Sequence, residues 1–357
     1  MAKINKHIEI VASNKSGLSS MGQKSRRGIQ AVLAAHYTDV RITVVDGLPD
    51  LEALVSRRPD LVFLGMKFIP EHPALGPYGS GKIWIGRYLD DHGIVYTGSA
   101  APAHMLELNK GLAKRCVVEA GLRTARFHII RKGQIPSLAG RSLNYPVFIK
   151  PTDRGGGLGI DSASLAYNVD QLSAKIRSLA AEFHADSLVE EYLPGREFSV
   201  GILKAVDGYA VMPIELVAPV NDRGARFLSA EVKLADTERN LEVTDEALKA
   251  ELNELALDVF HALGGRDYGR IDIRLDSHGT PHFLEANLLP SLLEGYGNFP
   301  KTCLLNLGLH YGPMVLQIVD LAFARNITVT DENLAEATPL HRTHFHFHRG
   351  TVTNSSF

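Results

Sequence analysis

One segment, residues 269–290, constrains the fold of this chain more than any other stretch. Apolar residues alternate in YGRIDIRL and again in PHFLEAN, and the residues DSHG between them have the composition of a tight turn. The pattern predicts two adjacent strands that bring Asp272, Glu285 and Asn287 near one another. Such oxygen-bearing side chains, without histidine or cysteine, suit a hard cation such as Mg2+, which prefers a few carboxylates together with substrate phosphates. Taken alone, the segment is explained equally well by an ordinary hairpin with a polar, solvent-facing side.

The first 100 residues alternate between strand-like and helix-like patterns. Strands are expected in HIEIVA, VRITVVD, DLVFLGM and GIVYTG, and helices in the segments 18–37, 48–58 and 82–93 between them. This alternation predicts an α/β domain with a parallel sheet that is covered on both faces. A single helix is expected over 102–122, and further strands and a long helix over 244–265 precede the hairpin.

Composition sets the broad class. A chain of 357 residues with 45% hydrophobic residues predicts two or three domains. The net charge of -2 gives no sign of a nucleic-acid footprint, and no apolar run reaches the roughly 18 residues of a transmembrane helix. The N-terminus lacks the apolar region of a signal peptide, and Cys116 and Cys303 cannot form a disulfide framework. We therefore expect a cytoplasmic protein that binds neither nucleic acid nor a membrane.

A glycine-rich loop follows a predicted strand in VFIKPTDRGGGLGI. The strand ends at Lys150, and the loop carries Gly155, Gly156, Gly157 and Gly159. Glycines let backbone N–H groups approach a phosphate, and the lysine adds a positive charge. The loop is neither a Walker loop nor a Rossmann fingerprint, because the required spacings are absent. Glycine loops are often plain turns, but this loop, with its lysine and the later acidic cluster, favours phosphate binding.

A third segment, SLVEEYLPGREFSVGIL, joins two predicted strands. Glu190 and Glu191 end the first strand, Leu193 follows, and Glu197 opens the second. Backbone groups and an apolar neighbour in such a linker can hold a purine ring, and the carboxylate beyond it can accept ribose hydroxyls. On this segment alone, a hairpin with a solvated acidic turn is the simpler interpretation.

Taken together and in this order, these motifs resemble the ATP-grasp superfamily, and specifically the D-alanine–D-alanine ligase family. Lys110 in ELNKGLAKR and Lys233 in AEVKL complete the set, and the resemblance runs from about residue 94 to about residue 323. It implies a three-domain α/β ATP-grasp fold with an N-terminal parallel-sheet domain. The implied ranges are 1–100 for the N-terminal domain, 101–195 for the central domain, 196–325 for the C-terminal domain and 326–357 for an extension.

The resemblance also implies a reaction and its cofactors. ATP would lie between the central and C-terminal domains with two Mg2+ ions, or Mn2+ in their place, on its phosphates. A small-molecule carboxylate would be phosphorylated to an acylphosphate, and an amine would then attack it to form an amide. We expect the enzyme to be a homodimer.

Roles for single residues follow from the same resemblance. Lys233 would approach the γ-phosphate, and Arg270 would stabilise the acylphosphate and the oxyanion formed on amine attack. The implied metal ligands are Asp272, Glu285 and Asn287. The implied ATP contacts are Lys110, Lys150, Gly155, Gly156, Gly157, Gly159, Glu190, Glu191, Leu193 and Glu197. These roles suit phosphoryl transfer, which needs positioning and charge neutralisation more than covalent help.

The chain departs from the family where substrates would bind. The glutamate that pairs with an alanine ammonium in D-alanine ligases is Leu18 here, and the Glu-Gly-Ser-Ser of the glycine loop begins with Arg154 and has no serine. The candidate substrate residues are Lys15, Ser16, Arg154, Ser291 and Tyr296. We therefore predict an ATP-dependent carboxylate–amine ligase whose substrates are not two D-alanines.

Other interpretations remain open at this stage. A genuine D-alanine–D-alanine ligase with a rebuilt pocket fits the same motifs, and so does a non-catalytic ATP-binding regulatory protein, although nucleotide binding alone does not need Arg270. The C-terminal HRTHFHFHRG places His344, His346 and His348 on one face of a predicted strand. That face could bind a metal, but a solvated strand or a subunit contact is the simpler interpretation.

Overall fold

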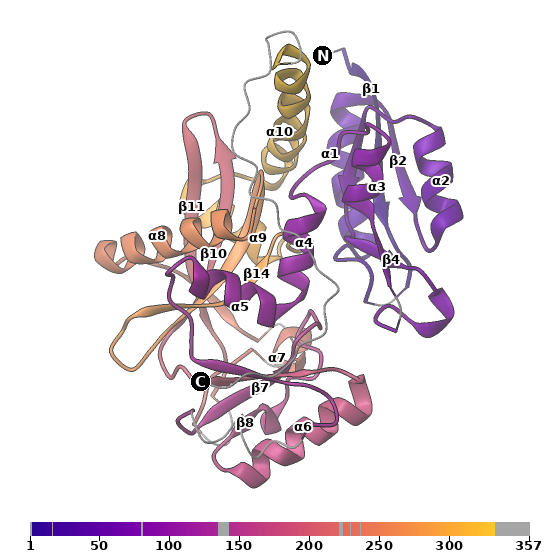
Figure 1. The fold of residues 1–357 in the computed structure, drawn as a ribbon. Helices are drawn as coiled ribbons and strands as arrows, with labels where there is room; N and C mark the ends of the chain where they lie inside the picture. The colour runs from indigo at the N-terminus through magenta and orange to yellow at the C-terminus, as the bar shows by residue number, and fades with distance from the viewer. Residues whose placement is uncertain are drawn as a thin grey trace.

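The computed structural model describes residues 2–15, 17–79, 81–134, 143–220, 224–228, 230–235 and 237–332. Within them the chain forms a three-stranded, a four-stranded and a five-stranded sheet with helices packed on them, together with one two-stranded hairpin (Figure 1). The predicted α/β class is therefore confirmed. The histidine-rich tail lies outside the described residues.

The N-terminal unit is a parallel sheet in the order β2-β1-β3. Its strands are β1 (Ile4–Ala12), β2 (Tyr37–Val44) and β3 (Leu61–Leu64), and its helices are α1 (Gln23–His36), α2 (Leu48–Ser56) and α3 (Ile85–Asp91). Successive residues of a strand point to opposite faces. Ile8 and Ile10 of β1 accordingly pack in a core with α1, whereas Val11 packs in a second core with α2 and α3. Both faces of the sheet are covered, as the sequence pattern predicts.

Two sequence predictions in this region are wrong in detail. The segment GIVYTG forms no strand but an isolated bridge, in which the Thr97 backbone N–H donates to the Val62 carbonyl at 3.0 Å. Gly93 and Gly98, with positive φ values of 64° and 81°, interrupt the extended backbone on either side of this bridge. The segment 82–93 begins as a strand, β5 (Lys82–Trp84), which pairs with β4 (Phe68–Pro70) before α3 starts.

The helix expected over 102–122 is two helices, α4 (Ala101–Leu108) and α5 (Lys110–Glu119). Asn109 separates them with extended backbone angles, and its side chain accepts a hydrogen bond from the Leu112 N–H. Asparagine favours such a cap because its side chain competes with the backbone of a helix interior. The break sets Lys110 at the first position of a helix.

The central and C-terminal units are antiparallel sheets in the orders β6-β9-β7-β8 and β12-β11-β10-β13-β14. The central elements are β6 (Phe127–Ile130), β7 (Val147–Pro151), β8 (Leu165–Ala166), α6 (Val169–Phe183) and β9 (Ser187–Glu191). The C-terminal elements are β10 (Glu197–Ala205), β11 (Gly208–Val217), α7 (Ala230–Ala235), β12 (Arg239–Glu242), α8 (Glu246–Ala262), β13 (Tyr268–Leu275), β14 (Pro281–Asn287), α9 (Asn298–Leu307) and α10 (Tyr311–Glu332). The hairpin predicted from residues 269–290 is thus β13–β14.

Two helices, α5 and α10, pack in the cores of units other than the nearest one in sequence. Ala113 and Val117 of α5 are buried in one core with Phe260 of α8 and Ile271 of β13. Helix α10 returns to the N-terminal unit, where Ile318 is buried in the core that holds β1 and α1. The sequence ranges for the three domains stay predictions, because α4, α5 and α10 each pack against a sheet other than their nearest one in sequence.

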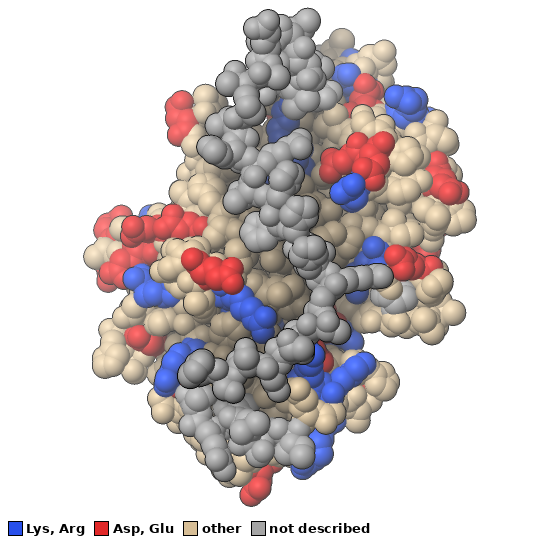
Figure 2. All heavy atoms as spheres, in the orientation of Figure 1, with Lys and Arg blue, Asp and Glu red and all other residues tan. Residues whose placement is uncertain are grey.

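Among the described residues, no single helix is long and apolar enough to cross a membrane; α9 and the described part of α10 reach that criterion only as a pair, bent by 103°. Figure 2 shows basic and acidic side chains interspersed over the described part of one face. Acidic side chains gather at the edge where α8 lies.

A buried ion pair fastens α10 to the N-terminal unit. The fully buried Asp267 accepts a hydrogen bond from the Gly98 N–H at 3.1 Å and forms an ion pair with Arg325 of α10. Arg325 also donates to the Tyr96 carbonyl at 2.6 Å. One carboxylate thus joins three segments that are far apart in the sequence.

We predict that Asp267→Ala destabilises the protein by about 3–5 kcal/mol, because it leaves Arg325 unpaired in a partly buried position. The matched control is Asp39→Ala, which removes an exposed ion pair with Arg41 and should change the stability far less, because solvent screens such a pair. Thermal melts of the two variants test the difference. Equal melting temperatures would contradict the role assigned to Asp267.

Candidate active site

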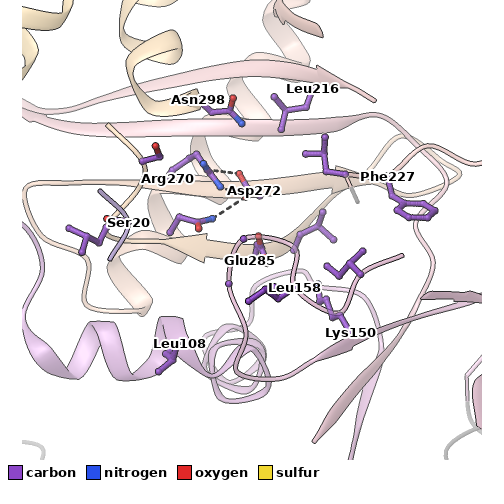
Figure 3. A pocket seen from close by; sticks show the side chains of 18 of the residues that line it. Ser20, Leu108, Lys150, Leu158, Leu216, Phe227, Arg270, Asp272, Glu285 and Asn298 are labelled. Carbon is purple, nitrogen blue, oxygen red and sulfur yellow. Dashed lines mark hydrogen bonds and ion pairs between the residues drawn. The ribbon is translucent and has the colours of Figure 1, made fainter. Parts of the chain in front are cut away.

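A cavity of ≈ 520 Å³ lies where the three units meet. Its lining comes from the loops after β1 and β3, from the glycine loop after β7, and from the strands β9, β10, β13 and β14. Figure 3 shows Ser20 and Leu108 at one end, Phe227 at the other, and Arg270, Asp272 and Glu285 between them. The cavity is therefore elongated, with the charged residues of the hairpin near its middle.

The hairpin β13–β14 brings the predicted metal ligands together. Asp272 pairs in register with Glu285, and Arg270 with Asn287, so that all four face the cavity from adjacent strands. Alternation along a strand places residues two apart on one face, which explains why the sequence pattern found them.

The carboxylate of Asp272 is surrounded by donors. Arg270 donates from Nε at 3.0 Å and from its terminal nitrogen at 2.9 Å, Ser199 donates at 2.7 Å, and Asn287 donates at 3.1 Å. An ionised carboxylate has about four lone-pair sites. These four hydrogen bonds match that capacity, so a metal ion on Asp272 would have to replace one of them.

The donor set still suits Mg2+. Two carboxylates, from Asp272 and Glu285, and the amide of Asn287 provide hard oxygen atoms next to the cavity. No group of three or more His, Cys, Asp or Glu side chains that could hold a metal occurs in the described part of the chain. A Mg2+ site is expected to have few protein carboxylates when nucleotide phosphates supply its remaining ligands.

Glu190 is buried between two lysines. Its carboxylate lies 2.7 Å from the Lys150 Nζ and 2.9 Å from the Lys114 Nζ. Burial raises the pKa of Glu190, but the two lysines outweigh burial and hold the pKa below its usual range. Lys114 also donates to Thr124 Oγ1 at 2.6 Å and to the Phe283 carbonyl at 3.2 Å. Sequence reasoning missed Lys114, although it lies one helical turn after Lys110.

Lys110 joins the glycine loop to the hairpin. Its Nζ donates to the Arg154 carbonyl at 2.5 Å and lies 3.8 Å from Glu285 Oε2. Burial limits the side chain to 9% exposure, and Lys110 is not among the residues that line the cavity. Lys150, by contrast, lines it.

The four glycines of the loop have different tasks. Gly155 and Gly156 line the cavity, and a Cβ on either would meet nothing within 4 Å. Gly159 has a φ of 77°, and its Cβ would lie 3.0 Å from Leu179 and 3.1 Å from Pro151. Gly157 and Gly159 are not cavity-lining. The first two glycines therefore suit an approaching phosphate, while Gly159 is required by packing.

The segment between β9 and β10 lines the far end of the cavity through Glu191, Leu193 and Glu197. Glu191 pairs with Arg126, and Glu197 accepts from Arg274 at 2.9 Å. Apolar side chains complete this end: Phe148, Ile160, Leu216 and Phe227. A planar aromatic ring fits between such side chains. Arg274 is 5% exposed, and nothing in its sequence context marked it in advance.

The candidate substrate residues divide into two groups. Ser291 and Tyr296 line the cavity, and so does Leu18, the residue at the altered family position. Lys15 and Arg154 do not, which corrects their placement. Lys15 donates to the Asp46 carbonyl at 3.0 Å from an exposed position. The Arg154 guanidinium stacks on the cavity-lining Tyr78 at 3.8 Å and donates to Asp153 and to the Phe183 carbonyl.

Two predicted residues cannot be placed fully, since Ser16 and the Lys233 side chain lie outside the described residues. The backbone of Lys233 lies in α7. A lysine that the sequence analysis did not single out, Lys67, lines the cavity beside Leu18. It follows directly after the predicted strand DLVFLGM, which is the one signal that could have indicated it.

Comparisons with known proteins agree with this geometry. Residues 116–320 match the family model described as "D-ala D-ala ligase C-terminus". The D-alanine–D-alanine ligase of Pelobacter propionicus is 33% identical over 266 residues, covering 74% of this chain and 78% of the relative. That of Geobacter sulfurreducens is 30% identical over 311 residues, covering 85% and 90%.

Solved structures have the same fold. The D-alanine–D-alanine ligase from Bacillus anthracis complexed with ATP superposes with a TM-score of 0.69 at 20% identity, over 91% of this chain and 99% of that chain. The ligase from Coxiella burnetii gives a TM-score of 0.64 at 16% identity, over 92% and 97%. The resemblance inferred from the sequence motifs is confirmed. The chain belongs to the D-alanine–D-alanine ligase family of ATP-dependent ligases with the ATP-grasp fold.

Proposed function

We propose that this ligase joins a small-molecule carboxylic acid to an amine through an acylphosphate, and that its substrates are not two D-alanines. The arrangement that carries the proposal is Arg270, Asp272 and Glu285 in the middle of one cavity, with Lys150 and the glycine loop beside them. Nucleotide binding alone does not need the partly buried Arg270 at this place, which favours catalysis over a regulatory ATP-binding protein.

The proposed reaction has two steps. A carboxylate oxygen of the acid attacks the γ-phosphorus of ATP, which forms the acylphosphate and releases ADP. The amine nitrogen then attacks the acyl carbon, phosphate leaves with the bonding electron pair, and the nitrogen loses a proton. Lys150, Gly155 and Gly156 would hold the phosphates, while Arg270 and Lys233 would stabilise charge that develops during transfer.

Asp272, Glu285 and Asn287 would hold two Mg2+ ions. When bound, these ions would neutralise charge on the ATP phosphates. Arg270, Ser199 and Asn287 now donate hydrogen bonds to Asp272, so one of these side chains would have to turn away from it. For Arg270 that movement would free the guanidinium to pair with the acylphosphate.

The substrate proposal rests on the wall that the first 100 residues contribute to the cavity. Leu18, Met66, Phe68 and Tyr78 belong to it, and it contains no Asp or Glu among the described residues. The carboxylates of the cavity all come from later in the chain: Glu190, Glu191, Glu197, Glu238, Asp272 and Glu285. A free α-ammonium at this wall would lack a counter-charge, and breaking a buried charge pair costs about 3–5 kcal/mol.

The remaining expectations belong to the same proposal. An enzyme of this kind would work in the cytoplasm, where ATP is abundant, and we propose a homodimer. A genuine D-alanine–D-alanine ligase with a rebuilt pocket is the alternative that the family relationship favours.

We predict that Glu285→Gln lowers ADP release by roughly 100-fold or more, because it removes a charge that holds the metal ions on the phosphates. The matched control is Glu242→Gln, an exposed carboxylate on β12 of the same sheet. ADP release is measured with Mg-ATP and a panel of acids and amines. Wild-type turnover of Glu285→Gln would remove the metal role of Glu285.

Mg-ATP should raise the melting temperature of the wild type, as any ligand selective for the folded state does. Lys150→Ala should reduce this shift, because a buried cation that faces the phosphates is lost while Lys114 still neutralises Glu190. Lys132→Ala, an exposed lysine after β6, serves as the control. No shift of the wild type at millimolar Mg-ATP would refute the proposed nucleotide site.

D-Alanine alone with Mg-ATP should give little or no D-alanyl-D-alanine, since Leu18 cannot pair an ammonium. Mass spectrometry of the reaction measures the dipeptide, and an authentic D-alanine–D-alanine ligase provides the positive control. Efficient dipeptide formation with saturation at micromolar to millimolar D-alanine would establish the alternative instead.

A further inference from the structure

One cation lies on the otherwise uncharged wall of the cavity. Among the described lining residues before residue 100, Lys67 is the one with a charged side chain. Its neighbours in the lining include Leu18, Met66 and Phe68, and Leu108 and Leu289 extend the apolar surface from later elements. A single charge on an apolar, partly enclosed wall interacts more strongly with a ligand than the same charge in water.

Lys67 forms an ion pair with the buried Glu107 of α4. Its Nζ lies 2.6 Å from Glu107 Oε1, and the other oxygen of Glu107 lies 3.1 Å from His104 Nδ1. The side chains of Glu107 and His104 are 3% and 1% exposed, whereas that of Lys67 is 21% exposed. Glu107 and His104 are thus buried on the α4 side, whereas Lys67 is partly exposed and lines the cavity.

The charge of Glu107 is secure near neutral pH. Burial raises the pKa of Glu107, but Lys67 and His104 outweigh burial and lower the pKa to about 2. Lys67 lines the cavity and Glu107 does not. An ammonium has three donor hydrogens, and the hydrogen bond to Glu107 uses one of them.

We propose that Lys67 forms an anion subsite, and that the acid substrate therefore carries a second negatively charged group, joined by an apolar spacer to the carboxylate that is activated. This inference rests on the proposed function and names the substrate class of that same site. A carboxylate on Lys67 gains a charge-assisted hydrogen bond. A free ammonium there would be repelled, which agrees with the loss of a glutamate at Leu18.

The test compares straight-chain acids that differ in a single terminal group. Succinate is paired with butanoate and glutarate with pentanoate, and binding is measured by calorimetry on the full chain loaded with Mg2+ and a non-hydrolysable ATP analogue. We expect the dicarboxylate of at least one pair to bind about tenfold or more tightly than its monocarboxylate, which is about 1.4 kcal/mol.

The variant that tests the residue is Lys67→Met with Glu107→Gln. Replacing the lysine alone would leave a buried carboxylate without its cation and could unfold the protein. The double change removes both charges, and the carbonyl oxygen of the introduced amide would still accept from His104. Lys82→Met is the matched control, because Lys82 lies over the Phe68 ring at 5.2 Å but does not line the cavity.

Loss of the dicarboxylate preference in the double variant, with its retention in Lys82→Met and an unchanged Mg-ATP melting shift in both, supports the inference. Equal binding of the paired acids to the wild type, including no binding of either, overturns it. So does a preference that survives in the double variant. If the wild type shows a Mg-ATP shift alongside either overturning result, the ligase proposal stands while the Lys67 inference fails.

Discussion

The buried carboxylate of Glu190 is the contact on which the geometry of the site depends. Glu190 belongs to β9 and pairs with Lys150 of β7 and with Lys114 of α5, and Lys114 in turn binds the Phe283 carbonyl of β14. Removing Glu190 would leave two buried lysines without their shared carboxylate, at a cost of about 3–5 kcal/mol. The network therefore fixes the central sheet, which carries the glycine loop, relative to the hairpin with Asp272.

The cavity combines two different environments, one rich in charged side chains and one mostly apolar. The middle and far end are dense in charge, and two of the arginines there are paired: Arg270 with Asp272, and Arg274 with Glu197. The wall from the N-terminal unit is apolar apart from Lys67 and small polar side chains. In the proposed reaction, phosphoryl transfer would need the charged environment whatever the acid is, whereas the apolar wall would select the acid. Members of one family can keep the charged environment while the residues of the apolar wall change.

Sequence reasoning was most successful where local pattern and side-chain role coincide. The alternation in β13 and β14 placed Arg270, Asp272, Glu285 and Asn287 correctly on one face, because a strand repeats every two residues. Lys15 and Arg154, named as candidates from their positions in the sequence, do not line the cavity, because local sequence does not show where a long side chain finds its partner. Lys15 donates to the Asp46 carbonyl, and Arg154 stacks on Tyr78 of the cavity wall.

The sequence by itself determined the fold class, the family, and the motifs that line the middle and far end of the cavity, since these follow from short-range periodicity and from the order of motifs. The tertiary structure alone decided which charges meet. Lys67 and Glu107 are 40 residues apart, and Lys114 and Phe283 are 169 apart. No local pattern encodes such contacts, because they arise when helices such as α4 and α5 pack against a sheet that forms much later in the chain.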